Sequence, residues 1–157
     1  MRKIASGSSL KPHIRPAGKE DFDDLMELEN ICFKEEKFHK KQLEYLLFKA
    51  RSIVFVASTE NNIVASIIVL TRKNISHARI YSLNVHPDYR RQGIAGLLMD
   101  TAEQSLKERG FKKISLEVGV NNKAAQSLYI SKGFSTDKIM KKYYKNGDDA
   151  LHLIKEL

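Results

Sequence analysis

The sequence has few of the residues that stabilise secreted or metal-binding proteins. Its single cysteine, Cys32, cannot form an internal disulfide, and its five histidines are isolated rather than spaced for metal binding. The longest apolar stretch, residues 63–70, is much shorter than the ~20 residues that span a bilayer. No apolar segment follows Arg2 and Lys3 in the manner of a secretory signal peptide. We therefore expect an intracellular protein, in the cytoplasm, with no metal site and no membrane partner.

The charge balance is positive, because 27 lysines and arginines face 19 aspartates and glutamates and leave a net charge of +8. This excess is compatible with nucleic acid, an anionic membrane surface or a phosphate-bearing cofactor. The basic residues lie in scattered pairs and do not alternate with aromatics as in RNA-binding modules, so no specific nucleic acid is expected. With 157 residues, 42% of them hydrophobic, the chain predicts one globular domain over residues 11–157 after a disordered leader at residues 1–10.

The hydrophobic pattern alternates between the strand period and the helix period along the chain. It predicts helices at residues 22–33, 40–50, 93–109 and 122–131. It predicts strands at residues 13–16, 53–57, 63–70, 80–85, 114–118, 134–144 and 150–154. The pair Asn61-Asn62 indicates one hairpin, and Asn146-Gly147 indicates a second with a two-residue type I′ turn.

The segment Arg90–Gly96, between a strand and the longest predicted helix, has the composition of an anion site. Free N–H groups and the dipole at a helix N-terminus attract phosphate, and Gly93, Ala95 and Gly96 let it approach the backbone closely. The segment lacks the Gly-Lys-Ser/Thr of a Walker A loop and the three glycines of the dinucleotide fingerprint. The alternative interpretation is a helix start whose small residues allow tight packing.

This segment resembles the Arg/Gln-x-x-Gly-x-Gly/Ala motif of the GNAT superfamily of acetyltransferases. Segments similar to other motifs of that family occur in the same order, at Leu83-Asn84-Val85, Asn122 to Tyr129, and Gly133-Phe134. The resemblance covers residues 12–157. It implies the GNAT fold, an α/β (α+β) architecture with about four helices on a mixed, mostly antiparallel sheet. That sheet is expected to be splayed where the strands of Val85 and Val118 part.

A narrower resemblance concerns the RimI-like and archaeal protein N-terminal acetyltransferases. It rests on Leu116-Glu117-Val118 and on Tyr143-Tyr144 followed by Asp148-Asp149-Ala150. The sequence departs from that branch at Gly119, where arginine is frequent. The branch acetylates the α-amine of protein chains, so the resemblance implies protein N-termini as substrate.

The resemblance also implies acetyl-CoA as the cofactor, with CoA as the product. The cofactor-binding residues that it implies are Leu83, Asn84, Val85, Arg91, Gln92, Gly93, Ile94, Ala95, Gly96, Asn122 and Tyr129. It implies substrate contacts from Phe33, Phe38 and Tyr144, and an oxyanion donor among the backbone N–H groups near Val85. Asn122 has an alternative structural reason, because it can cap the short helix that follows.

Two residues are predicted to carry acid–base chemistry. Residues 114, 116 and 118 share one face of their strand, so Glu117 projects from the opposite face, where its carboxylate can accept a proton from the amine through water. The phenol of Tyr129 can donate a proton to the departing sulfur. The alternatives are a surface glutamate and a packed aromatic residue.

Alternation along a strand also bears on the two neighbouring tyrosines. If the last long strand includes Tyr143 and Tyr144, only one of the two rings can face the cleft. The resemblance selects Tyr144 for binding the peptide backbone. Cys32 lies on the apolar side of the first helix and is predicted to be a core residue rather than a nucleophile.

We therefore predict an N-acetyltransferase that moves acetyl from acetyl-CoA to the N-terminal α-amine of proteins by direct attack. An α-amine has a pKa of about 7.7–8.0, against about 10.4 for lysine, so a modest base suffices to deprotonate it near neutral pH. The expected partners are protein N-termini, with ribosome association left open. Two alternatives remain, a lysine or small-amine acetyltransferase of the same fold and a basic RNA- or ribosome-binding module with a vestigial acyl site.

Overall fold

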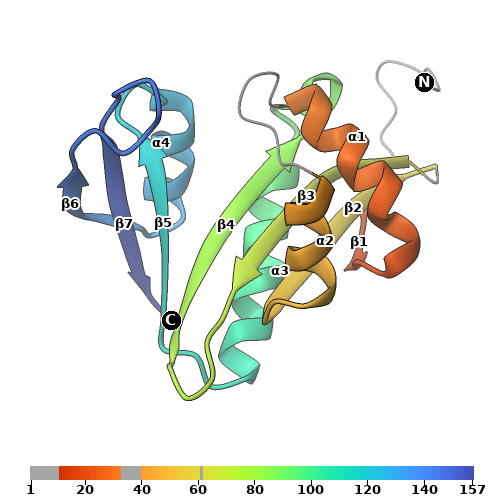
Figure 1. Ribbon diagram of the computed structural model, residues 1–157, viewed down its shortest axis with the longest axis horizontal. Helices are drawn as coiled ribbons and strands as arrows, with labels where there is room; N and C mark the ends of the chain where they lie inside the picture. The colour runs from red at the N-terminus through yellow and green to blue at the C-terminus, as the bar shows by residue number, and fades with distance from the viewer. Residues whose placement is uncertain (1–10, 33–39, 61) are drawn as a thin grey trace.

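The computed structural model describes residues 11–32, 40–60 and 62–157 (Figure 1). The predicted leader at residues 1–10 and the predicted substrate contacts Phe33 and Phe38 lie outside this part of the chain. No helix of the described part is both long and apolar enough to cross a membrane.

A single seven-stranded sheet organises the protein, in the spatial order β1-β2-β3-β4-β5-β7-β6. The strands are β1 (His13–Pro16), β2 (Ser52–Thr59), β3 (Asn62–Leu70), β4 (His77–Val85), β5 (Lys113–Gly119), β6 (Ser135–Met140) and β7 (Ala150–Glu156). All neighbours run antiparallel except β4 and β5, which are parallel. The predicted mixed, mostly antiparallel sheet is therefore confirmed, and so is the β2–β3 hairpin.

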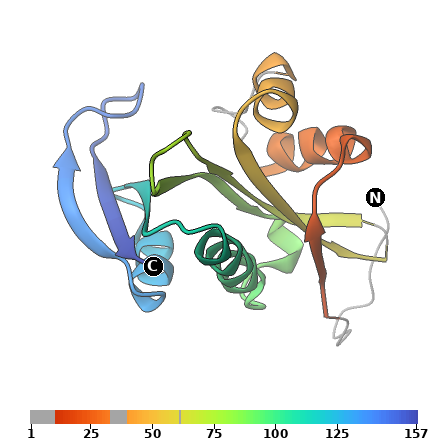
Figure 2. The same cartoon turned by 90° about the horizontal axis from the view of Figure 1, so that it is seen from below.

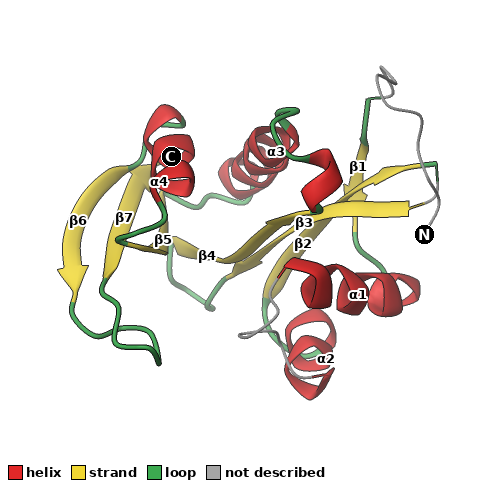
Figure 3. Cartoon of the chain, turned by 90° about the horizontal axis from the view of Figure 1, so that it is seen from above, coloured by secondary structure: helices red, strands yellow, loops and turns green. Residues whose placement is uncertain are grey.

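In the described part of the chain, four α-helices cover the two faces of the sheet, namely α1 (Phe22–Cys32), α2 (Lys40–Phe48), α3 (Ile94–Glu108) and α4 (Lys123–Ser131). Helices α1 and α2 lie on one face, and α3 and α4 lie on the other (Figures 2 and 3). The larger core includes the fully buried Leu98, Ala102 and Leu106 of α3. A smaller core beneath α1 and α2 includes Leu25 and Leu43.

The sheet is splayed in its middle. Strands β4 and β5 pair only from His77 with Lys113 to Arg79 with Ser115, and beyond these residues they diverge (Figure 1). We call the diverging segments, residues 80–85 of β4 and 116–119 of β5, the fork. Because strand edges inside the fork lack a neighbouring strand, their backbone N–H and C=O groups are available to another molecule.

A bulge in β4 decides which side chains face which layer. Its pairing with β3 shifts from Ser82 opposite Ile68 to Ile80 opposite Val69, so Tyr81 is the extra residue. Ala78 and Ile80 pack in the larger core before the bulge, and Leu83 and Val85 pack against the same core after it. Before the bulge the even-numbered residues of β4 face α3, and after the bulge the odd-numbered residues do.

The last hairpin differs from the prediction. Strand β6 ends at Met140, so residues 141–149 form a loop instead of a continuation of the strand to residue 144. Side-chain hydrogen bonds compete here with the backbone hydrogen bonds of the β-ladder. Asp149 accepts a hydrogen bond from the N–H of Lys142 at 2.9 Å, and Asn146 accepts one from the N–H of Asp148 at 2.9 Å. The prediction of a two-residue type I′ turn at Asn146-Gly147 is therefore wrong.

Candidate functional site

The edge of β4 inside the fork presents main-chain groups of two predicted cofactor residues. The N–H of His86 donates to the carbonyl of Val64. Residues of an antiparallel strand alternate between those that hydrogen-bond the neighbouring strand and those that do not, so every second residue of β4, counted back from His86, is hydrogen-bonded to β3. Leu83 and Val85 fall between these partners, so their N–H and C=O groups point away from β3 and toward the fork. Consistent with this direction, the carbonyl of Val85 accepts from Nε of Arg90 at 3.1 Å.

Asn84, predicted with them as a cofactor-binding residue, faces elsewhere. Its register makes it a hydrogen-bonded partner of Ser66 on β3, and its buried side chain donates to Glu29 of α1. Glu29 is 3% exposed, and burial raises its pKa to about 7. Asn84 therefore supports the strand from the α1 side and does not contribute a side chain to the fork.

The turn before α3 has the backbone of an anion site. Arg91 and Gly93 both adopt left-handed conformations, with φ of 62° and 78°, and Gly93 is the N-cap of α3. Such turns direct successive N–H groups into one concavity, next to the positive end of the helix dipole. Arg91 and Gln92 are exposed beside it, whereas the side chain of Ile94 is buried and leaves only its N–H for a ligand.

Gly96 lies in the first turn of α3, close to the end of α4. A methyl group at this position would meet the end of the Lys132 side chain, at 3.0 Å from Cε. Lys132 also bonds Asp100, with Nζ 3.2 Å from the carboxylate. The end of a lysine side chain therefore lies where a side chain at position 96 would project, and Ala95 next to it is half-buried.

Helix α4 places Asn122 and Tyr129 on the same side of the sheet. Asn122 is the N-cap and accepts from the N–H of Ala125 at 3.2 Å, so its structural role is confirmed, and its side-chain N–H groups remain for a ligand. The ring of Tyr129 packs edge-on against Phe134. Burial, together with the nearby Tyr144, raises the pKa of Tyr129 to about 12, so its phenol stays protonated and can act as a donor.

Glu117 faces the α1/α2 side of the sheet, opposite to its neighbours on β5, as strand alternation predicts. Its side chain is 8% exposed, and both carboxylate oxygens have partners. Nε of Arg79 donates to Oε1 at 2.6 Å, and Nδ1 of His152 lies 2.7 Å from Oε2. Glu117 is therefore neither a free surface glutamate nor mobile, because β4 and β7 hold it from both sides.

Both tyrosines lie in the β6–β7 loop, so the strand geometry from which only one ring was predicted to face the cleft is wrong. Tyr143 accepts a hydrogen bond from Nη2 of Arg79 at 3.1 Å. A methyl group on Gly119, at the end of β5, would lie 3.6 Å from Cε2 of Tyr144. The two rings are perpendicular, with centroids 5.1 Å apart. In a loop the alternation of a strand does not apply, which is why the parity argument failed.

Three residues that contact the candidate site escaped the sequence analysis. Arg79 and His152 belong to strands adjacent to β5, and only the register of a parallel and an antiparallel pair brings them to Glu117. Lys132 reaches α3 from the end of α4. Cys32 is half-buried at the end of α1, its thiol donates to the carbonyl of Val85 at 3.5 Å, and burial raises its pKa. Within the described residues no group of three or more histidine, cysteine or acidic side chains could hold a metal ion.

The arrangement separates two chemical tasks. Main-chain groups, the turn before α3 and Tyr129 gather on the α3/α4 side, where a long ligand with phosphates and amides can bind. A fixed carboxylate lies on the α1/α2 side at the same fork. Such a site can accept a proton from a nucleophile that arrives from one side while it binds an activated acyl group from the other.

Comparisons with known proteins agree with this description. The sequence matches the acetyltransferase (GNAT) family over residues 22–134. It is 32% identical over 122 residues to the N-alpha-acetyltransferase 30 of Schizosaccharomyces pombe, across 76% of this chain and 81% of that protein. The ribosomal-protein-S18-alanine N-acetyltransferase from Escherichia coli has a TM-score of 0.84 at 25% identity, across 92% of this chain and 93% of that one. A chain of the NatC complex bound to Gag peptide and CoA has a TM-score of 0.82 at 26% identity, across 94% and 99%.

Proposed function

The chain belongs to the acetyltransferase (GNAT) family, and we propose that the amine it acetylates is the α-amine at the N-terminus of a protein. Its acetyl donor is acetyl-CoA, which supplies an activated thioester. The Schizosaccharomyces pombe relative is named an N-alpha-acetyltransferase, and the Escherichia coli neighbour acts on the alanine of a ribosomal protein. Both names support an α-amine as the acceptor.

The observation that carries this proposal is the position of Glu117. Its carboxylate is fixed at the fork by Arg79 and His152, on the face opposite to Tyr129 and the turn before α3. An amine that approaches from the α1/α2 side therefore meets a base before it meets the thioester. Glu117 accepts the amine proton through a water molecule, because its two oxygens already have protein partners.

The other side of the fork holds the donor. The main-chain groups of Leu83 and Val85 bond the pantetheine amides, and the N–H of Val85 also faces the oxygen that becomes negative during attack. The turn from Arg91 to Gly96 binds the pyrophosphate, with Asn122 at the side. Tyr129 donates a hydrogen bond to the departing sulfur.

The chemistry of the base favours an α-amine over lysine. Near neutral pH an α-amine, with a pKa of about 7.7–8.0, is neutral in roughly one hundred times more molecules than lysine, whose pKa is about 10.4. A carboxylate that works through water suffices for the first but is a weak base for the second. Tyr143 and Tyr144, beside Arg79 and Gly119, form a wall against which the first residues of an extended chain can lie.

Two peptides of identical sequence test the proposal, one with a free and one with a blocked N-terminus, and each with one internal lysine. Incubation with acetyl-CoA and intact-mass analysis should show acetylation of the free peptide and at least about tenfold slower reaction of the blocked one. Comparable rates on the blocked peptide would move the chain to the lysine acetyltransferases.

The cellular setting is part of the same proposal. Because the Escherichia coli neighbour modifies a ribosomal protein, we place this chain in the cytoplasm with ribosome-associated N-termini among its substrates. Sedimentation of a cell lysate through a sucrose gradient tests this association. A chain found only in the ribosome-free fractions, at low salt, would contradict it.

A further inference from the structure

A groove of about 700 Å3 lies on the α1/α2 side of the sheet, next to Glu117. One end is formed by β4, β5 and β7, and the other by the end of α2 and the loop between β3 and β4. Five of its lining residues are lysines or arginines: Lys49, Arg51, Arg72, Lys73 and Arg79. Among the residues that line it in the described chain there is no aspartate or glutamate.

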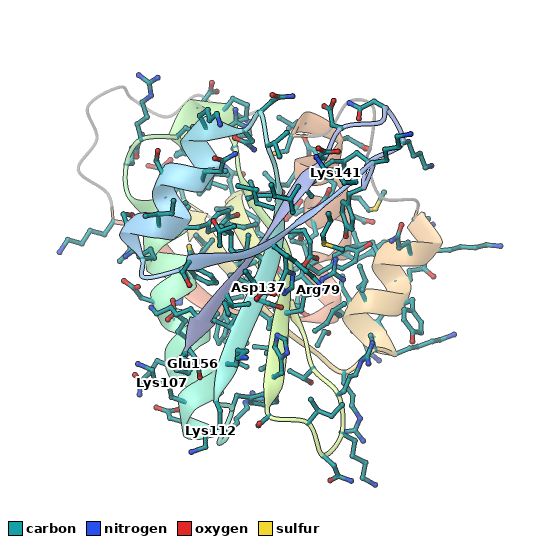
Figure 4. All side chains as sticks on the ribbon, turned by 90° about the vertical axis from the view of Figure 1, so that its left-hand side faces the viewer. Arg79, Lys107, Lys112, Asp137, Lys141 and Glu156 are labelled. Atoms are coloured by element: carbon teal, nitrogen blue, oxygen red, sulfur yellow. The ribbon has the colours of Figure 1, made fainter. Side chains whose placement is uncertain are left out.

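The groove is continuous with the proposed catalytic site through two side chains. Arg79 and His152 both line it, and both contact Glu117 directly. Figure 4 labels Arg79 on β4 and Asp137 on the edge strand β6. Asp137 lies 3.9 Å from His152. The negative charges near this end, Glu117 and Asp137, thus already face cationic or imidazole partners. Among the described residues, no acidic side chain forms an ion pair with the lysines and arginines farther along the groove.

We propose that this basic groove binds acidic side chains of the substrate polypeptide, a few residues after the N-terminus that is acetylated. The proposal rests on the proposed function, because it takes the N-terminus of the substrate to lie at Glu117. It adds a substrate class, proteins whose N-terminal segment is acidic.

The length of the strands indicates which substrate residues reach the groove. Glu117 lies four residues from the start of β5 at Lys113, and strands rise about 3.3 Å per residue, so this distance is roughly 13 Å. An extended substrate chain covers it in about four residues. The exposed Arg72 and Lys73, in the loop just beyond, would then meet side chains near positions four to six of the substrate.

RNA is the other polyanion that a basic surface can bind, and the position of this groove favours the peptide. The groove ends at Arg79 and His152, the two partners of Glu117, so a chain whose N-terminus lies at Glu117 can continue into the groove. Arg79 is held by Glu117 and Tyr143, so its guanidinium is fixed at the end of the groove where the N-terminus of the substrate is proposed to lie.

The test compares two peptides with the same first three residues, one with glutamates at positions four to six and one with glutamines there. At low salt we expect kcat/KM to be on the order of fivefold higher for the acidic peptide, because single exposed ion pairs contribute small factors that combine. The preference should shrink as salt rises to about 0.5 M, where the Debye length falls to a few ångströms.

The double variant Arg72→Gln/Lys73→Gln should bring the acidic-to-neutral ratio of kcat/KM close to one. Lys107→Gln/Lys112→Gln, which removes the same charge at exposed positions that do not line the groove, is the matched control and should keep the wild-type ratio (Figure 4). A wild-type ratio of one, or an equal loss in the control, would overturn the proposal.

Two further results distinguish this proposal from the proposed function and from RNA binding by the groove. If neither peptide is acetylated at its α-amine, the proposed function itself fails, whereas equal acetylation of both leaves that function intact and removes only the groove proposal. If Arg72→Gln/Lys73→Gln keeps the peptide ratio but loses affinity for a fluorescent poly-uridylate RNA, the groove binds RNA and the proposal is wrong.

Discussion

The free energy of unfolding of Glu29→Gln, relative to that of wild type, should increase as pH rises. Burial in α1 raises the pKa of Glu29 to about 7, against 4.5 for an unperturbed glutamate. Between these two pH values the folded protein holds a proton that the unfolded chain has lost, so wild-type stability falls as pH increases. Glutamine cannot ionise, and its side chain can still accept the hydrogen bond from Asn84.

The magnitude follows from the two pKa values. A difference of about 2.5 units, at 1.36 kcal/mol per unit, corresponds to about 3 kcal/mol once both states are fully titrated. The free energy of unfolding of the variant minus that of wild type should increase from pH 4 by about 1 kcal/mol at pH 5, 2 at pH 6 and 3 at pH 7. Above about pH 8 the difference should stay constant.

Urea denaturation of both proteins at pH 4 to 8.5 measures this difference, and other titrating groups cancel between the two curves. Glu27→Gln, at an exposed position of the same helix, is the matched control for a glutamate-to-glutamine change in α1. A Glu29→Gln difference that does not change with pH, or that has the opposite slope, would refute the reasoning that Glu29 is a buried, neutralised acid behind Asn84.

Three further substitutions address the site. Gly96→Glu should weaken acetyl-CoA binding at least about tenfold by calorimetry, because it places a carboxylate beside the phosphates. Gly96→Ala is the milder control, since its methyl group meets only the flexible end of Lys132, and equal acetyl-CoA affinities of the two variants would place the phosphates elsewhere. Tyr129→Phe should lower turnover by about 10²–10⁴-fold while leaving the acetyl-CoA dissociation constant nearly constant, and unaltered turnover would exclude a donor role. His152→Ala removes one of the two partners of Glu117, so we expect lower kcat and a shifted pH profile; a loss of stability with the wild-type pH profile would mean that His152 is only structural.

Strand alternation and capping rules correctly predicted two local features of this site. The direction of Glu117, away from the larger core, follows from the apolar residues on either side of it, and Asn122 caps α4 because asparagine at that position satisfies a free N–H. Both are local properties that a single segment determines. The divergence of β4 and β5, which came from the family resemblance, is also confirmed.

The features that could not be predicted from the sequence depend on contacts between distant segments or on loop geometry. Asn84 faces α1 because a bulge at Tyr81 reverses the alternation of β4, and nothing in the hydrophobic pattern reports a single extra residue. Arg79 and His152 meet Glu117 only through strand register, over separations of 38 and 35 residues. Tyr143 and Tyr144 lie in a loop and not in the predicted strand, because the side chains of Asp149 and Asn146 accept hydrogen bonds from the loop backbone.

The most direct test of the central claim is competition within one molecule. A peptide with a free N-terminus and one internal lysine is incubated with acetyl-CoA and the full-length protein, and tandem mass spectrometry locates the first acetyl group. We predict acetylation of the α-amine in at least about ten molecules for each one modified at lysine, and a loss of both products with Glu117→Gln. Equal modification of the two amines, or a lysine preference, would contradict the account.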